Sequence, residues 1–111
     1  MIKITIYKGN TETINVNLTQ SGAVYPLTDL KLKFIAKKTF TDLDTDALIN
    51  KEFVIDDPSS GIGILSLLHT DTDIPARTYQ SEIKLYKSDG TFIKTIDVGT
   101  LVISDVILRE V

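Results

Sequence analysis

The 111-residue sequence contains no cysteine and no tryptophan, and it has a single histidine. The lack of cysteine excludes disulfide bonds and thiolate metal sites. No segment approaches the roughly 20 apolar residues of a membrane helix, and the N-terminus has no apolar run of signal-peptide length. The formal net charge is −3 with both signs mixed along the chain, so no basic stripe is available for a phosphate backbone. The composition predicts one soluble domain, residues 1–111, that binds neither membrane nor nucleic acid.

Residues for catalysis are equally scarce. A serine hydrolase would have to combine His69 with Ser66 or Ser81, but no Gly-x-Ser-x-Gly pattern surrounds either serine. Gly61 and Gly63 lack the third glycine and the following helix of a dinucleotide-binding loop. We therefore expect a protein that is not an enzyme and that uses no cofactor.

What the sequence does contain is alternation of apolar and polar residues, which is typical of strands with one buried face. In the clearest case, residues 77–87, the side chains on the buried face are Tyr79, Ser81, Ile83 and Leu85. Further runs of this kind lie at residues 2–7, 14–18, 30–37, 47–55, 62–68, 91–97 and 101–108. About eight short strands without a helix of 10–15 residues predict an all-β, antiparallel sandwich or barrel.

Turn residues separate these runs. Asp56–Gly61 combines Asp, Pro and Gly in strong turn chemistry, and Ser88–Gly90 is the best hairpin signal. Residues 70–76 form a predicted corner, with one helical turn capped by Thr70 or Asp71. Tyr79 follows this corner, where immunoglobulin-like sandwiches often have a tyrosine that bonds to upstream backbone. It is either such a tyrosine corner or a half-buried strand tyrosine.

The one candidate metal site is a row of alternating carboxylates at Asp42, Asp44 and Asp46. Calcium loops of the EF-hand type also need glycine at the sixth position and glutamate at the twelfth. This sequence has Ala47 and Phe53 there, so we expect a solvated loop and no bound metal.

A row of lysines is the other charged feature. Lys31, Lys33 and Lys37 lie on one face of a predicted strand, with Ile35 between them. We interpret the row as a solvated outer face that discourages edge-to-edge pairing. The alternative is a contact with an anion or a polymer.

Six stretches of strand and turn residues occur in an informative order. They are Ile4-Thr5-Ile6-Tyr7-Lys8-Gly9-Asn10-Thr11 with Ile14-Asn15-Val16, then Tyr25-Pro26-Leu27-Thr28, Leu32-Lys33-Phe34-Ile35-Ala36-Lys37-Lys38, Asp46-Ala47-Leu48-Ile49-Asn50-Lys51, Asp57-Pro58-Ser59-Ser60-Gly61 and residues 70–79. In this order they resemble the N-terminal domain of phage baseplate upper proteins. Arg77 departs from the pattern, because such corners usually have glycine there.

The resemblance implies an immunoglobulin-like β-sandwich of about 7–8 strands, without catalytic residues, that attaches a fibre or receptor-binding apparatus to a phage tail. It also implies other tail or baseplate proteins as partners, a homo-oligomer such as a trimer or ring, and a location in the virion after synthesis in the bacterial cytoplasm. Longer relatives continue into a helical or fibrous region, so the chain is either a short form or an N-terminal fragment.

The predicted docking surface is a strand edge that pairs with a partner. We expect it at one of two apolar segments, 2–7 or 101–108, with residues Ile2, Ile4, Ile6, Leu101 and Ile103. The alternative function is an adhesin-like module that recognises a glycan or a host protein through loop aromatics, for which Tyr25, Phe40 and Phe92 are the candidates.

Overall fold

A computed structural model describes residues 3–20, 22–39, 41–43 and 46–104 of the chain. Most of these residues are in strands, and the helical parts are short. The strands are β1 (Lys3–Tyr7), β2 (Glu12–Asn17), β3 (Thr19–Gln20), β4 (Ala23–Val24), β5 (Leu30–Lys37), β6 (Ile49–Glu52), β7 (Ile62–Leu67), β8 (Arg77–Lys87) and β9 (Phe92–Ser104). The helix α1 spans His69–Thr72, and the 3₁₀ turn η2 spans Pro58–Ser60.

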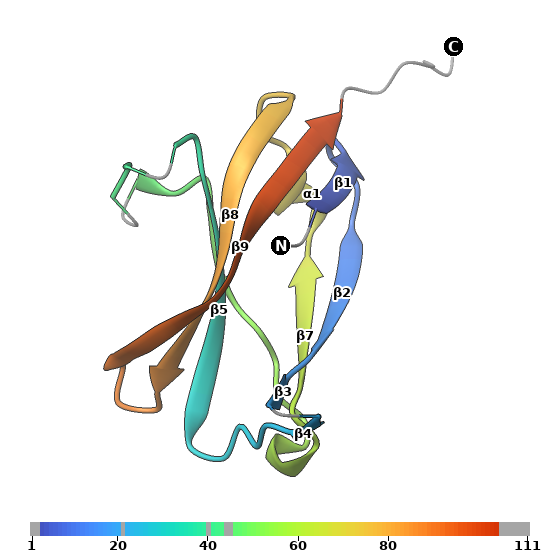
Figure 1. The fold of residues 1–111 in the computed structure, drawn as a ribbon. Coiled ribbons are helices and arrows are strands. Elements are labelled where there is room, and N and C mark those ends of the chain that lie inside the picture. The colour runs from blue at the N-terminus through green and yellow to red at the C-terminus, as the bar shows by residue number, and fades with distance from the viewer. Residues whose placement is uncertain (1–2, 21, 40, 44–45, 105–111) are drawn as a thin grey trace.

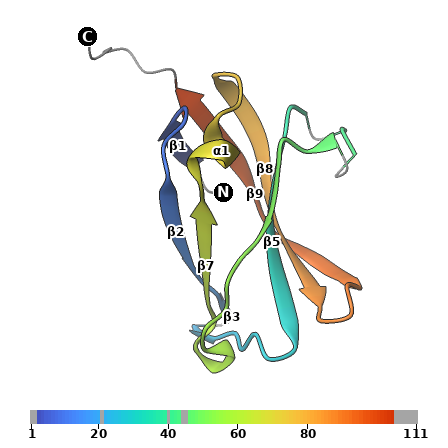
Figure 2. The ribbon, with the colours of Figure 1, turned by 180° about the vertical axis from the view of Figure 1, so that it is seen from behind.

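The strands form two facing layers (Figures 1 and 2). The larger sheet has the order β1-β9-β8-β5-β6, whereas β2 pairs with β7 in the smaller one, and β3 pairs with β4. A bridge between Val54 and Ile64 adds the segment after β6 to the other side of β7. The order β9-β8-β5-β6 is that of the GFCC′ sheet of immunoglobulin variable domains, and β2–β7 corresponds to the B and E strands. The predicted all-β sandwich is confirmed.

The first strand departs from the predicted antiparallel arrangement. β1 pairs in parallel with β9, from Lys3 opposite Thr100 to Tyr7 opposite Ser104. The reason is the turn after β1, where Gly9 has a φ of +82° and the chain crosses to the other layer. β2 therefore pairs with β7 instead of returning along β1. This leaves β1 at the sheet edge beside β9, which runs in the same direction.

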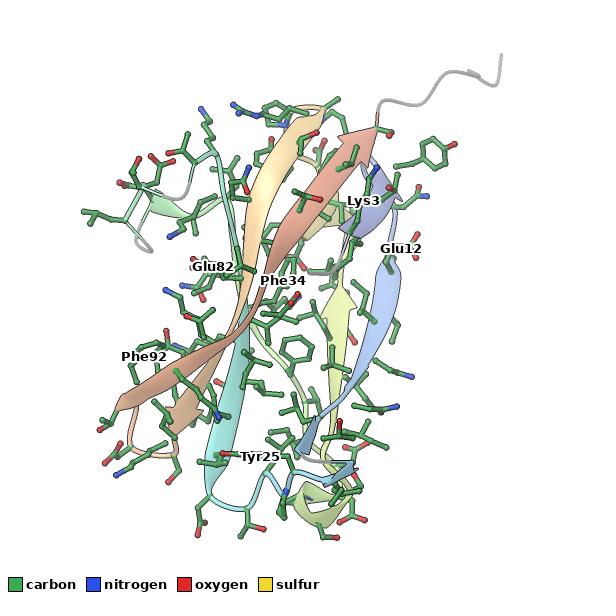
Figure 3. The ribbon with its side chains drawn as sticks, viewed as in Figure 1. Lys3, Glu12, Tyr25, Phe34, Glu82 and Phe92 are labelled. Atoms are coloured by element: carbon green, nitrogen blue, oxygen red, sulfur yellow. The ribbon has the colours of Figure 1, made fainter. Side chains whose placement is uncertain are left out.

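The hydrophobic core lies between the layers and is built from alternate strand residues. In β8 the buried side chains are those that the period of two predicts, Tyr79, Ser81, Ile83 and Leu85. Phe34 of β5 points between the layers, whereas Glu82 of β8 lies on the other side of the larger sheet (Figure 3). Burying one large apolar side chain contributes about 1.5–3 kcal/mol, so these alternating positions are the main source of stability. The other large buried side chains include Ile6, Leu18, Leu27, Leu32, Phe34, Ile49, Phe53, Leu65, Leu67, Leu101 and Ile103.

The last strand is longer than its pattern predicts. Instead of two strands, 91–97 and 101–108, β9 runs unbroken over Phe92–Ser104, with two register shifts against β8. β9 lies between β1 and β8, and Leu101 and Ile103 are buried. The predicted docking edge at Leu101 and Ile103 is therefore wrong, because their apolar pattern comes from facing the core of a central strand. Residues 105–108 of that prediction lie outside the described residues.

A corner between β7 and β8 closes one end of the sandwich. The predicted helical turn is present as α1, but it begins after Leu68, and the Asp71 carboxylate accepts a hydrogen bond from the Leu68 backbone N–H at 2.8 Å. The N-cap position is thus Leu68 and neither Thr70 nor Asp71. Asp71 lies in the first turn of the helix, and its carboxylate bonds back to the Leu68 N–H. The Tyr79 hydroxyl donates to the carbonyl oxygen of Pro75 at 2.5 Å, the type of bond that makes a tyrosine corner. Burial raises the pKa of Tyr79.

The opposite end is held together around η2. The Asp57 carboxylate accepts hydrogen bonds from Ser59 N and Oγ, and Gly61 ends the turn with a φ of +69°. The Gly61 carbonyl accepts from Leu18 N at 2.8 Å, and the Pro58 carbonyl accepts from Leu27 N at 2.7 Å. The predicted turn at residues 56–61 therefore also fastens the segment that precedes β5 to the start of β7.

Candidate docking surfaces

β1 presents an open edge of the larger sheet. Lys8 N donates to the Ser104 carbonyl at 2.8 Å. Because the backbone groups of a strand alternate in direction, those of Ile4 and Ile6 face β9, and those of Thr5 face away from it. No pairing on that outer side of β1 is found among the described residues. The edge is thus a place where another strand can add.

The predicted docking residues of β1 have different positions. Ile2 lies outside the described residues. Ile4 is half-buried and Ile6 is only 3% exposed, because both side chains point into the core. A partner at this edge would therefore meet the backbone of Thr5 and the Tyr7 side chain, which is 52% exposed.

Lysines and aromatic rings cover the outer face of the larger sheet. The rings of Tyr86 and Phe92 meet edge to face, with their centroids 5.5 Å apart. Lys33 Nζ lies 4.9 Å from the Tyr86 centroid, and Lys84 Nζ lies 5.7 Å from the Phe92 centroid. Such cation–π contacts are worth about 0.5–1 kcal/mol at exposed sites. The face is therefore basic, with its aromatic surface partly covered by lysine stems.

The third lysine of the predicted row, Lys37, is buried rather than solvated. Its Nζ lies 3.0 Å from Glu82 Oε1 and donates to the Asp42 carbonyl at 3.1 Å, while Lys84 Nζ lies 3.7 Å from the same Glu82 oxygen. No hydrogen bond of good geometry reaches this oxygen from the described residues, so charge attraction holds it. Ile35, the cross-strand partner of Glu82, is also buried on this outer face. Lysine stems can cover apolar surface in this way, which the alternating pattern alone does not reveal.

The outer face of the smaller sheet is uncharged. Its residues alternate with the core positions of β2 and β7, and they pair across the two strands. They are Thr13, Asn15 and Asn17 from β2 and Ser66, Ile64 and Ile62 from β7. Val54, bridged to Ile64, extends this face and is 54% exposed. The two outer faces of the sandwich therefore differ in charge.

Two ion pairs fasten the corner at α1. Lys51 Nζ lies 2.5 Å from Asp71 Oδ2, and Lys8 Nζ lies 2.6 Å from Asp73 Oδ1. Burial alone would raise the pKa of Asp71, but the hydrogen bonds from Lys51 and Leu68 outweigh it and lower the pKa. The hydrogen bond from Lys8 and its charge lower the pKa of Asp73. Both carboxylates are thus stabilised in the charged form.

Acid should weaken this corner through Asp71. A carboxyl whose folded pKa is depressed gives stability above its unfolded pKa of about 3.9, and this stability is lost as the pH falls through the folded value. Asp71→Asn should cost about 1 kcal/mol at neutral pH, and its Tm should fall less than that of the unchanged protein between about pH 5 and pH 3. Thermal melts at several pH values measure this, with Asp56→Asn, an exposed carboxylate outside the corner, as the control. Equal pH dependence in Asp71→Asn and the unchanged protein would contradict the assignment.

The predicted carboxylate row does not gather into a metal site in the described part of the chain. Asp42 accepts hydrogen bonds from Thr39 N at 3.3 Å and from Thr39 Oγ1 at 3.0 Å. Asp44 lies outside the described residues, and Asp46 is exposed. Within residues 3–104, apart from the gaps in the description, no three acidic, histidine or cysteine side chains are placed to hold a metal ion.

The residues of the other candidate functions are also separated. The ring centroid of Tyr25 lies 5.3 Å from Lys94 Nζ, beside a cavity of about 240 Å³. Phe92, in contrast, packs on the outer face of the larger sheet. Phe40 lies outside the described residues. Tyr25 and Phe92 therefore form no single platform for a glycan. Of the candidate serines, Ser81 is buried in β8, whereas Ser66 is exposed, as is His69.

Comparisons with known proteins bear on these surfaces. The sequence model of the BppU N-terminal domain family matches residues 1–104. The fold is similar to the "N-terminal domain of phage TP901-1 ORF48", with a TM-score of 0.62 and 10% identity over 91% of this chain and 83% of that chain. At this identity the likeness shows a shared fold. No curated protein matches the sequence significantly. Among the described residues, no helix has the length and apolar character to span a membrane.

Proposed function

The chain belongs to the BppU N-terminal domain family, and from this premise we propose that it attaches a fibre or receptor-binding apparatus to the phage tail through protein–protein contacts. The family is that of baseplate upper proteins, which gives the chain a structural role in the tail or baseplate. The proposed partners are other tail and baseplate proteins, and the proposed place of action is the assembled virion. The proposed role is structural and needs no catalytic residue.

The observation that supports docking most directly is the open edge of β1. A strand at a sheet edge offers unpaired N–H and C=O groups to a further strand, and adding one is a recurrent mode of recognition. The backbone of Thr5 faces outward, and Tyr7 stands beside it with an exposed ring. Lys3 at the start of the strand is also exposed, which discourages indiscriminate pairing. The edge is therefore suited to specific binding of one partner strand.

The experiment replaces Thr5 by proline in the phage and measures how much of the chain enters purified particles. Proline removes the outward N–H of Thr5, which β9 does not use, and its ring obstructs an added strand. We expect a folded protein whose incorporation, counted by mass spectrometry of tryptic peptides, falls at least about tenfold.

The matched control is Asn15→Pro, which removes an outward amide from β2 at the edge of the smaller sheet. This variant should enter particles normally if docking uses β1. Normal incorporation of Thr5→Pro would refute docking at β1. Absence of the unchanged chain from intact particles would refute the role in the virion altogether.

A further inference from the structure

We infer that the first half of β9, residues 92–98, binds an extended segment of a partner protein at its open edge and takes an acidic side chain of that segment beside Lys94. β1 pairs only with the last part of β9, residues 100–104 (Figure 1). β8 covers the opposite edge of β9. Among the described residues, no strand therefore covers residues 92–99 on the β1 side. The inference goes beyond the proposed function, because it concerns a second edge and the chemistry of its partner.

The cavity of about 240 Å³ opens at this edge. Three consecutive residues of β9 and three residues of the facing layer line it, namely Lys94, Thr95 and Ile96 with Leu18, Thr19 and Tyr25. Consecutive side chains of a strand point to opposite faces, so a cavity that touches three in a row meets the edge of the strand and not one face. Since β8 pairs with Lys94 and Thr95 at the other edge, the cavity is at the open one. A strand added to β9 would therefore pass directly over the cavity.

The only charged residue that lines this cavity is Lys94. It pairs with Leu85, a core residue, so its side chain lies on the inner face of the sheet. Its Nζ lies 5.3 Å from the centroid of the Tyr25 ring, and this contact orders the flexible lysine across the gap between the layers. No ion pair joins Lys94 to a carboxylate of the described residues, and Asp97, the nearest acidic residue along the strand, is not part of the lining. A carboxylate that enters the cavity would thus meet an ammonium group that has no other anionic partner.

An extended segment suits this edge better than a small carboxylate ligand. Ile93 and Val98, near the two ends of the open edge, are 37% and 36% exposed, and a ligand confined to the cavity would leave both uncovered. Added strands gain affinity from main-chain hydrogen bonds and specificity from pockets that take alternate side chains. A lysine at a sheet edge also discourages pairing with an arbitrary strand. The edge therefore selects a segment that places a carboxylate opposite Lys94.

Peptide titrations followed in amide NMR spectra of the 111-residue chain test the inference. The probe is a capped peptide of about seven residues, in which threonine alternates with valine and the central residue is glutamate. A second peptide has glutamine in the centre. We expect the glutamate peptide to shift the signals of residues 92–98 with a dissociation constant on the order of 1 mM, because a short segment buries little surface. It should bind at least about threefold more tightly than the glutamine peptide.

Two variants test the role of the charge. Lys94→Met keeps the apolar stem and removes the ammonium group, so it should abolish the preference for glutamate over glutamine. The matched control, Lys87→Met, changes an exposed lysine at the end of β8 that does not line the cavity, and it should keep the preference.

Three results would overturn the inference. They are signals of residues 92–98 that do not move at about 5 mM peptide, shifts confined to β1, and a preference for glutamate that survives Lys94→Met. Shifts of the same signals with protein concentration, in the absence of peptide, would assign this edge to a second copy of the chain and would also contradict the inference. The measurement uses no phage, so its failure leaves the proposed role in the virion untouched.

Discussion

Replacing Glu82 by alanine should destabilise the domain by about 3 kcal/mol, because it removes the carboxylate that lies 3.0 Å from the Nζ of the buried Lys37. The side chain of Lys37 is 5% exposed and that of Glu82 is 14% exposed, so water can do little to replace the lost partner. The carbonyl of Asp42 remains as an acceptor for Lys37, but it carries no full charge. Urea unfolding followed by circular dichroism measures the change in free energy.

The double variant Lys37→Met, Glu82→Met tests the cause of this loss. Removing both charges together avoids an unpaired ion, and apolar side chains of similar size often replace a buried pair at little cost. The double variant should therefore be more stable than Glu82→Ala. Glu52→Ala, an exposed glutamate on β6, should change stability by no more than about 0.5 kcal/mol. A double variant that loses as much as Glu82→Ala would show that packing around Ile35, not the charge pair, determines the cost.

Replacing Gly61 by alanine should cost about 3 kcal/mol for two combined reasons. A φ of +69° disfavours any residue with a Cβ, by about 1–2 kcal/mol. The added Cβ would also lie 2.8 Å from the Tyr25 carbonyl oxygen and 2.9 Å from that of Leu18. Both atoms belong to the backbone that η2 holds in place, so neither can move without breaking hydrogen bonds.

The matched control for Gly61→Ala is Gly9→Ala. Gly9 also has a positive φ, +82°, but a Cβ there would meet no atom within 4 Å. Gly9→Ala should therefore lower the free energy of unfolding only by the conformational cost of a positive φ, about 1–2 kcal/mol. Chemical denaturation measures the free energy of unfolding of both variants, and the larger loss in Gly61→Ala gives the contribution of the steric overlap. Equal losses would show that the close approach of β7 to the loop before β5 relaxes freely.

Features that depend on neighbouring residues were predictable from the sequence. The alternation in residues 77–87 correctly gave the buried face of β8, since the period of two is a local property of a strand. The turn chemistry at Asp56–Gly61 likewise predicted a turn that ends in a glycine with positive φ, and the structure has the 3₁₀ turn η2 there. The all-β sandwich followed from many such local signals in succession.

Features that depend on distant parts of the chain were not predictable. Residues 101–104 look the same in a central strand and in an edge strand, and only the parallel addition of β1 makes β9 central. The segment 47–55 was predicted as one strand, but β6 ends at Glu52 because the chain then crosses to the smaller sheet, where Val54 pairs with Ile64. Lys37 has the sequence position of a surface lysine and is buried only because Glu82 lies on the neighbouring strand.

The same limit applies to the candidate docking surfaces. The sequence offered two candidate edges, 2–7 and 101–108, because alternation predicts a strand but does not distinguish an edge strand from a central one; of the two, only β1 is at an edge of the larger sheet. The uncharged face of the smaller sheet has no local signal, since its residues come from β2, β7 and the segment around Val54, which are far apart in the chain. The charge of a face can be judged only when the residues that share the face are known, and these are known only from the strand pairing.

The parallel pairing of β1 with β9 has a mechanical consequence. Lys3 and Ser104 stand at opposite ends of the shared ladder, about 13 Å apart along the strands. Tension applied between them runs along the strands and strains all rungs of this ladder simultaneously. An antiparallel hairpin pulled from its two ends would instead open one rung at a time. The domain is thus built to resist stretching between Lys3 and Ser104.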